Sequence, residues 1–224
     1  MIEFEDVGFG YGRSSVLRET TLTFEPGTLT VLLGQPGSGK TTFLRLCSCD
    51  LEPTEGRIRL FGKAVPRRNR NGVALLRRAL GTMPQEPGFV EHLSVIDNVA
   101  LPLRASGTGR AERELDLRAL LEWVDLRERA DTLPAALTRG ERHRVALSRA
   151  LILSPEVILA DEPAGGVDQE SAERLLGLLV EVNRMGRTVL VATRDPAVAG
   201  RLGAAGAHSL LFGDGRVAVT EIAA

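Results

Sequence analysis

The sequence predicts an α/β fold with a mostly parallel core sheet, an N-terminal antiparallel β subdomain and an inserted helical subdomain. Nearly continuous apolar runs, typical of buried parallel strands, occur at 28–34 (TLTVLLG), 156–161 (EVILAD) and 187–193 (RTVLVAT), and each adjoins a helical pattern. Apolar and polar residues partly alternate near the N-terminus, and the segment 86–154 is mostly helical in pattern. We therefore predict one domain of 224 residues, in which 1–85 and 155–224 form the core and the β subdomain and 86–154 forms the helical insertion.

The individual elements follow from local patterns in chain order. IEFEDVGF and TTLTFEPG alternate as half-buried antiparallel strands do, and Pro26-Gly27 marks the turn after the second. Within the insertion, helices are predicted at 94–103, 109–126 and 137–150, separated by Pro, Gly and Ser residues. SLLFGDGRVAV contains two strand-like runs around Gly213-Asp214-Gly215, which predicts a hairpin near the C-terminus.

Composition limits the classes of function. The 28 basic and 29 acidic residues give a net charge of −1, which argues against a general nucleic-acid binder. No run of about 18 apolar residues and no signal-peptide pattern occur, so we expect a protein of the cytoplasm. The cysteines, Cys47 and Cys49, are expected to pack as small hydrophobic residues, because a helix would point them in nearly opposite directions.

A basic segment without acidic residues extends from Arg57 to Gln85. We expect it to be a solvated loop, or alternatively to lie against anionic lipid headgroups. Its basic residues are Arg57, Arg59, Lys63, Arg67, Arg68, Arg70, Arg77 and Arg78.

A glycine-rich stretch follows the first apolar run. GQPGSGKTT matches the pattern G-x-x-x-x-G-K-[ST] between a predicted buried strand and an apolar-periodic helix. Its glycines let the backbone N–H groups converge on phosphate oxygens, and the helix start adds a favourable dipole. Lys40 would reach the β and γ phosphates of a nucleotide, and the Thr41 hydroxyl would bind Mg²⁺. The predicted phosphate-binding residues are Gly34, Gln35, Pro36, Gly37, Ser38, Gly39, Lys40, Thr41 and Thr42.

Two further motifs have a chemistry that fits a nucleotide site. VILADEP places Asp161 and Glu162 at the carboxyl end of a buried strand. There, Asp161 could bind Mg²⁺, and Glu162 could act as the base that orients or deprotonates the attacking water. In LTRGE, Thr138 and Glu141 form a T-x-x-E capping box, which predicts a helix start with free backbone amides.

These motifs occur in the order found in ABC-type ATPase domains, a family of phosphate-loop NTPases that the chain resembles over nearly its whole length. The resemblance rests on the phosphate loop, Gln85 in MPQEP, LTRGE, VILADEP and Asp168 in GGVD. It implies an enzyme that hydrolyses ATP to ADP and phosphate with Mg²⁺. In this family two ATP molecules are bound between the subunits of a head-to-tail homodimer, and the helix beginning at LTRGE, here called the signature helix, closes on the γ-phosphate held by the other subunit.

The resemblance also implies roles for individual residues. Gln85 would bind Mg²⁺ beside Thr41 and Asp161 and link the site to a membrane partner, and Asp168 would lie at the subunit junction. Tyr11 would stack on adenine, although packing at a strand end is an alternative. The expected catalytic residues are Glu162, Lys40, Gln85 and Arg194, and the expected nucleotide contacts outside the phosphate loop are Tyr11, Thr138, Arg139, Gly140 and Asp168.

The chain departs from the family pattern at two arginines. Arg139 replaces a signature glycine whose amide approaches phosphate, and it adds bulk and positive charge. Arg194 replaces a histidine that contacts the γ-phosphate and holds the catalytic carboxylate; it can donate to phosphate, or alternatively pair with Glu162. Gly165 and Gly166 are expected to loosen the loop before Asp168. We therefore predict ATP binding and dimer closure with slow hydrolysis; the alternatives are a normally active enzyme and a clamp that binds ATP without hydrolysing it.

Within the family, 90–104, 158–168 and 178–195 are most similar to the bacterial cell-division ATPase FtsE, whose membrane partner is FtsX. The same pattern is shared by ATPases of lipoprotein release and macrolide efflux, which remain alternatives. The resemblance implies an FtsX-like integral membrane partner and a location on the cytoplasmic face of the bacterial inner membrane. An ABC ATPase acting on DNA or ribosomes is disfavoured by the single nucleotide domain, the missing coiled-coil arms and the balanced charge.

A docking position for the membrane partner is expected near Gln85. Phe89, Val90, His92 and Leu93 could offer a groove to a partner helix, with a core role for Phe89 and Leu93 as the alternative. His92 and His143 are expected at the surface, away from the catalytic motifs.

Overall fold

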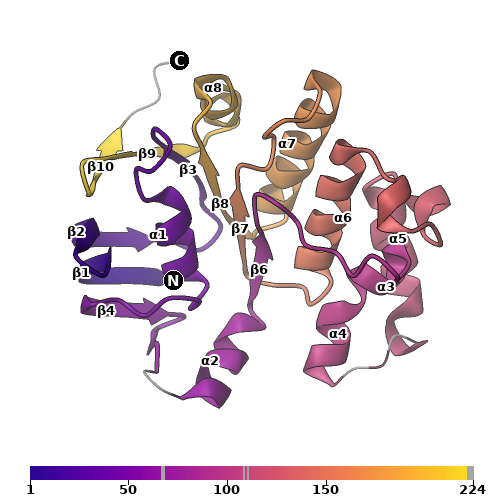
Figure 1. The fold of residues 1–224 in the computed structure, drawn as a ribbon, viewed down its shortest axis with the longest axis horizontal. Helices are drawn as coiled ribbons and strands as arrows, with labels where there is room; N and C mark the ends of the chain where they lie inside the picture. Colours follow the sequence, from indigo (N-terminus) through magenta and orange to yellow (C-terminus); the bar gives the residue numbers. More distant parts are fainter. Residues whose placement is uncertain (67–68, 108, 110, 221–224) are drawn as a thin grey trace.

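The computed structural model describes residues 1–66, 69–107, 109 and 111–220, and it contains two sheets (Figure 1). The first sheet has the strand order β2-β1-β4-β5 and is antiparallel throughout. The second has the order β10-β9-β3-β8-β7-β6, in which β9, β3, β8, β7 and β6 are parallel and β10 is antiparallel. The strands are β1 (Ile2–Tyr11), β2 (Ser14–Phe24), β3 (Leu29–Leu33), β4 (Glu55–Leu60), β5 (Lys63–Ala64), β6 (Leu80–Met83), β7 (Val157–Asp161), β8 (Thr188–Thr193), β9 (His208–Gly213) and β10 (Arg216–Thr220).

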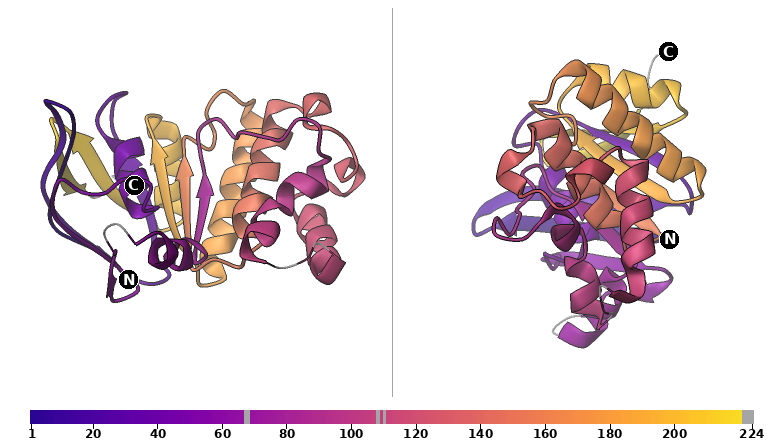
Figure 2. Two further views of the ribbon diagram at one scale, coloured as in Figure 1. Left: turned by 60° about the horizontal axis from the view of Figure 1, so that its bottom comes forward. Right: turned by 90° about the vertical axis from the view of Figure 1, so that its right-hand side faces the viewer.

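The helices cover both faces of the parallel sheet. Helix α1 lies between the two sheets, whereas α3 to α7 pack on the opposite side of the parallel sheet (Figures 1 and 2). The α-helices are α1 (Lys40–Cys47), α2 (Arg70–Arg77), α3 (Val95–Val99), α4 (Leu101–Ser106), α5 (Glu114–Trp123), α6 (Arg139–Leu151), α7 (Gln169–Arg184) and α8 (Pro196–Ala204). Short 3₁₀ helices span Ala111–Arg113, Arg127–Arg129 and Pro134–Ala136.

The apolar runs form strands buried on both faces. In β3, Val31 belongs to the core against the helices and Leu32 to the core against α1 and the antiparallel sheet, and both side chains are fully buried. The same alternation occurs in β7 at Ile158 and Leu159 and in β8 at Val189 and Leu190. Because each strand contributes to two cores, its sequence is apolar at nearly every position. The predicted mixed α/β architecture is therefore confirmed.

The prediction of a solvated loop for the basic segment is wrong in its described part. This segment contributes strands β4, β5 and β6 and helix α2. In β4, exposed Arg57 and Arg59 alternate with buried Ile58 and Leu60, so the strand has one polar and one apolar face. Arg67 and Arg68 lie outside the described residues.

Other local predictions are confirmed. Cys47 and Cys49 are free and buried. The hairpin of β9 and β10 turns at Asp214 and Gly215, whose φ angles of 50° and 74° lie in the left-handed region that such two-residue turns require. Within the described residues, no helix combines the length and the apolar character needed to cross a membrane.

Candidate functional site

The glycine-rich loop connects β3 to α1 and leaves the start of α1 open to a ligand. Gly39 is the N-cap of α1 with φ 100°, and it provides no side chain to cap the helix. The first turn of α1 contains no acidic residue. At Gly34, a Cβ atom would lie 2.6 Å from both the Phe212 carbonyl oxygen and Ser38 Oγ, so only glycine fits. The backbone N–H groups here form the kind of concave surface that binds anions.

The Lys40 ammonium is held over this loop. Nζ donates to the carbonyl oxygens of Gly34 at 2.6 Å and Gln35 at 3.1 Å, and to Ser38 Oγ at 3.4 Å. Burial lowers the pKa of Lys40, while the negative charges of Glu162 and Asp161 oppose this effect. A positive charge is thus placed where phosphate oxygens would meet the start of α1.

Asp161 ends β7 beside Thr41 of α1. Its carboxyl group is buried, and burial raises its pKa, partly offset by the hydrogen bond with the Thr41 hydroxyl and by the charge of Lys40. Its Oδ1 atom has no hydrogen-bond partner among the described residues. A buried carboxylate oxygen without a partner is costly, and a hard cation would satisfy it. The oxygens of Thr41 and Asp161 therefore fit the Mg²⁺ site that the sequence predicts.

Glu162 follows directly in a strained backbone conformation with φ 45°. Its N–H group donates to the Ala192 carbonyl at 2.8 Å, and its carboxylate accepts from Thr193 Oγ1 at 3.3 Å and from the backbone N–H of Arg194. Burial raises the pKa of Glu162, whereas the Lys40 charge lowers it. The first residues after β8 thus fix the direction of this carboxylate.

A cavity of about 370 Å³ brings several of these groups together. It joins part of the glycine-rich loop to side chains from β1, β2 and the segments after β6, β7 and β8. Gly34 and Gln35 do not line it, and Val16, which the sequence analysis missed, does. The lining residues are Tyr11, Val16, Pro36, Gly37, Ser38, Gly39, Lys40, Thr41, Thr42, Gln85, Glu162 and Arg194.

Tyr11 and Arg194 each had two interpretations. Tyr11 is 49% exposed; it contacts Phe9 edge-to-face at 5.0 Å, and its hydroxyl oxygen accepts from Arg45 at 3.4 Å. Packing therefore orients the ring without burying it.

Arg194 is exposed at the cavity, and in the described part of the chain no ion pair joins its guanidinium to Glu162. The pairing of Arg194 with Glu162 therefore stays an alternative that this conformation does not show.

The signature helix, α6, begins as predicted but lies outside this cavity. The Thr138 side chain accepts from the Glu141 N–H group at 3.2 Å, and the Glu141 carboxylate accepts from the Thr138 N–H group at 2.8 Å. Asp168 is the N-cap of α7, where it accepts from the Ser171 N–H group at 2.9 Å. Neither these residues nor Arg139 and Gly140 line the cavity around Lys40. Within one chain, the two groups of predicted nucleotide contacts are therefore separate.

His143 of α6 corrects a prediction. We expected it at the surface, but its side chain is 2% exposed. A hydrogen bond with the backbone of Pro163 raises the pKa of His143, against the larger effect of burial, and Nδ1 has no partner among the described residues. Pro163 directly follows Glu162, so His143 lies close to a catalytic motif after all.

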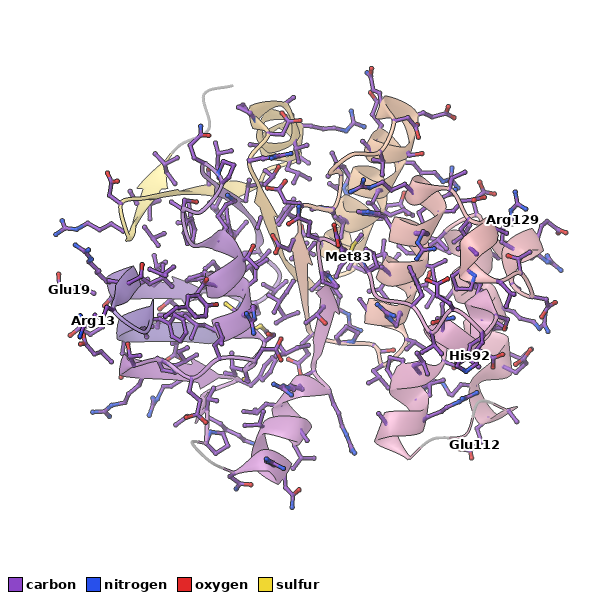
Figure 3. The ribbon with its side chains drawn as sticks, in the orientation of Figure 1. Arg13, Glu19, Met83, His92, Glu112 and Arg129 are labelled. Carbon is purple, nitrogen blue, oxygen red and sulfur yellow. The ribbon has the colours of Figure 1, made fainter. Side chains whose placement is uncertain are left out.

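The segment expected to dock a partner helix is only partly exposed: Phe89, Val90 and Leu93 are partly buried, and His92 is exposed. The Phe89 ring packs against the core and lies 4.9 Å from Arg142 and 5.2 Å from Arg149, measured from each guanidinium carbon to the ring centroid. Buried Asn98 donates to the carbonyl oxygens of Val90 and Leu93. His92 lies in the helical region and is exposed, whereas buried Met83 lies near the middle of the molecule (Figure 3).

Comparison with known proteins identifies the family. Residues 17–165 match the family model described as ABC transporter. The cell division ATP-binding protein FtsE of Escherichia coli (strain K12) is 38% identical over 197 residues, covering 87% of this chain and 88% of FtsE. An ABC transporter ATP-binding protein of Mycobacterium tuberculosis is 37% identical over 191 residues, covering 84% of this chain and 77% of that protein. The macrolide export ATP-binding/permease protein MacB of Chromobacterium violaceum is 36% identical over 191 residues, covering 85% of this chain but 30% of MacB.

Solved structures agree with this result. The dimeric, post-hydrolysis state of an ATP-binding cassette bound to ADP and Pi has a TM-score of 0.88 and 28% identity, and 100% of each chain is covered. The chain belongs to the ABC transporter family and is an ABC-type ATPase. Within that family it is similar to both FtsE and MacB at comparable identity, so the comparisons define the family and not the membrane complex.

Proposed function

We propose that the chain binds ATP with Mg²⁺ in the cavity around Lys40 and hydrolyses it slowly, in a head-to-tail dimer that moves a membrane partner. The observation that carries this proposal is the convergence of Lys40, the Thr41–Asp161 pair and Glu162 at the start of α1. Tyr11 would stack on adenine, Gln85 would reach Mg²⁺, and Thr138, Gly140 and Asp168 would act at the dimer junction. The separation of this last group from the Lys40 cavity within one chain supports its assignment to the partner subunit's nucleotide.

The chemistry follows from how the groups are placed. The Lys40 ammonium and the N–H groups of the loop stabilise negative charge on the β and γ phosphates. Bound Mg²⁺ would neutralise further charge on the phosphate oxygens, beside the Thr41 hydroxyl and the Asp161 carboxylate. Glu162, held by Thr193 and the Arg194 backbone, accepts a proton from the attacking water or orients it. Its raised pKa makes it a better base than a freely solvated glutamate.

Slow hydrolysis is expected from Arg194. A histidine at this position can accept or donate a hydrogen bond, whereas a guanidinium only donates. Since the Arg194 side chain lines the cavity without pairing with Glu162, its charge is available to bind the γ-phosphate in the substrate as well as in the transition state. Binding that is uniform in both states lowers KM without raising kcat.

The test is steady-state ATP turnover of the native protein beside Arg194→His, Arg139→Gly, their double variant and Glu162→Gln as the blank. We expect native turnover above the blank and a rise of about tenfold in the double variant, equivalent to about 1.4 kcal/mol in the barrier. Native turnover equal to the blank would favour the ATP-binding clamp. High native turnover that neither replacement raises would show an ordinary ABC ATPase.

The membrane partner is proposed to be an FtsX-like integral membrane protein, which would place the chain on the cytoplasmic face of the inner membrane. The FtsE relative supports this choice, while the MacB relative supports an efflux or lipoprotein-release complex as the alternative. Residues 86–154 are proposed to act as one helical unit that follows this partner.

We propose that the membrane partner docks in a hollow near the segment of Phe89 rather than on Phe89 itself. This hollow of about 580 Å³ lies between α2 and α4, next to the strand that leads to Gln85. Arg70 and Arg78 are exposed at its edge, so a partner helix with acidic residues would complement its charge. Replacing Arg78→Glu should abolish co-purification of a membrane protein from detergent-solubilised membranes, whereas Arg13→Glu, at the exposed β1–β2 turn, should not. Recovery of ribosomes or DNA with the native protein would contradict the membrane assignment.

A further inference from the structure

The Arg139 guanidinium lies on a loop of its own subunit. A Cβ atom added to Gly166 would lie 2.8 Å from Arg139 Cζ and Nη1 and 3.1 Å from Nη2. Real Cβ atoms do not come this close, so the guanidinium occupies space that exists because residue 166 is glycine. Gly166 belongs to the loop 163–167, which joins Glu162 to Asp168.

The same helix contacts the start of this loop and the helix that follows it. His143, one turn after Arg139 in α6, donates to the Pro163 carbonyl at the start of the loop. Beyond the loop, Gly140 lies directly against the side chain of Ser171 in the first turn of α7, and the Ser171 N–H group donates to the Asp168 carboxylate. Helix α6 therefore contacts the beginning and the middle of the connection between Glu162 and Asp168, and the first turn of α7 that follows it.

We propose that Arg139 is a latch within its own subunit, which restrains the loop 163–167 through Gly166 and thereby sets the position of Glu162. Arg139 is then a positioning residue for hydrolysis rather than a ligand of the partner subunit's phosphate. This inference rests on the proposed ATPase function and gives it a cause for slow turnover. The loop must adjust when the dimer closes around ATP, and the guanidinium on Gly166 opposes that adjustment.

The two possible actions of Arg139 predict opposite effects for Gly166→Asn. Asparagine tolerates the left-handed φ of 69° at this position, and its side chain would displace the flexible guanidinium. If Arg139 acts as a latch, Gly166→Asn opens the latch and reproduces Arg139→Gly. If Arg139 instead obstructs the partner's phosphate, freeing the guanidinium from the loop leaves the obstruction in place, and turnover stays low or falls.

The experiment is a double-mutant cycle of Arg139→Gly and Gly166→Asn on the full chain, with two measurements. Deuterium uptake of peptides covering 162–168 is measured without nucleotide, and kcat and KM are measured for ATP. Gly62→Asn is the matched control, because Gly62 has a similar φ of 72° and no atom within 4 Å of an added Cβ. We expect each single variant to raise uptake and kcat by about two- to fivefold at unchanged KM, and the double variant to match the larger single effect.

The proposal is overturned if Gly166→Asn leaves uptake of the loop unchanged, if it lowers kcat while Arg139→Gly raises kcat, or if the two effects multiply. Failure of the ATPase proposal is distinguishable: native turnover equal to Glu162→Gln would refute hydrolysis, while the uptake cycle would still report whether Arg139 restrains the loop.

Discussion

At the scale of single residues, the hydroxyl of Thr193 connects the end of β8 to Glu162. Thr193 Oγ1 donates to the Glu162 carboxylate at 3.3 Å and accepts from the Asp195 N–H group at 3.0 Å. This bond stabilises the ionised carboxylate and so lowers the pKa of Glu162, against the larger effect of burial, which raises it. The protonation state of the proposed base therefore depends on a residue that ends the apolar run 187–193 and to which the sequence analysis gave no role.

Replacing Thr193→Val should move the acid limb of the kcat profile to higher pH. Without the hydrogen bond, the pKa of Glu162 rises, so the carboxylate is protonated at a higher pH. Because only the ionised form acts as a base, kcat is lost at a higher pH on acidification. The measurement is kcat as a function of pH at saturating ATP and Mg²⁺. Thr193→Ser, which keeps the hydroxyl, is the control. An acid limb at the same pH in all three proteins would refute the connection.

Asp161 illustrates a conflict between stability and function. Its buried Oδ1 atom lacks a partner in the described residues, so the folded state without metal bears an uncompensated cost. Asp161→Asn removes the charge and should stabilise the nucleotide-free protein by about 1 kcal/mol. The same change should remove the extra stabilisation that ATP with Mg²⁺ gives over ATP alone. Both effects are measured by thermal unfolding without nucleotide, with ATP alone, and with ATP and Mg²⁺. A variant that is less stable than the native protein without nucleotide would contradict this view of Asp161.

At the scale of elements, the sequence analysis succeeded where one feature dominates a segment. Strands β3, β7 and β8 were predictable because burial on both faces leaves apolar runs, and the start of α6 was predictable from the Thr138–Glu141 capping box. Strand β4 and helix α2 were missed because the whole segment was interpreted from its basic residues and its lack of acidic ones, although buried residues of β4 alternate with exposed arginines.

The burial of His143 could have been predicted from the sequence. His143 lies three residues after Gly140 and four before Leu147, and residues at these spacings share one face of a helix. Gly140 and Leu147 are both buried, so this face points inward. What the sequence could not supply is the acceptor, because the Pro163 carbonyl comes from a distant segment whose path depends on the whole sheet. The Arg139 contact with Gly166 was beyond sequence reasoning for the same reason.

Because burial disfavours the charged form of His143, acidification should weaken the docking of α6. Burial lowers the pKa of His143 below the usual 6.5, and the Arg139 charge adds to this effect, while the bond to Pro163 opposes it. The unfolded chain then takes up the proton at a higher pH than the folded chain, so stability is full above pH 6.5 and is lost as the pH falls from there through the folded pKa.

The test compares urea unfolding of the native protein and His143→Gln between pH 7.5 and pH 5. The glutamine amide can donate to the Pro163 carbonyl but does not titrate, so the native protein should lose more stability on acidification than the variant. His92→Gln, at an exposed histidine, is the control and should follow the native protein. Parallel curves for native and His143→Gln would show that His143 does not contribute to the pH dependence.

At the scale of the whole molecule, the residues proposed to bind nucleotide form two separate groups in the described chain. Lys40, Thr41, Asp161 and Glu162 lie around α1, while Thr138 and Gly140 lie at the start of α6 outside that cavity. The solved relatives with similar folds include a dimeric post-hydrolysis cassette and a dimeric bacterial ABC transporter cassette. A second copy of the chain, arranged head to tail, would bring the start of its α6 to the phosphates held by the first.

Glu162→Gln should therefore form a dimer with ATP and Mg²⁺, with twice the 24.1 kDa mass of one chain, because it binds ATP but cannot complete hydrolysis. Adding Lys40→Ala to this variant should keep the protein monomeric, since the phosphates lose their main cation. Replacing Thr138→Arg should also prevent dimers, yet leave ATP binding to the monomer intact, because Thr138 lies outside the subunit's own cavity. Analytical ultracentrifugation and binding of a fluorescent ATP analogue separate these cases. Loss of monomer binding in Thr138→Arg would mean that the start of α6 serves its own nucleotide and that the two groups do not act across a dimer.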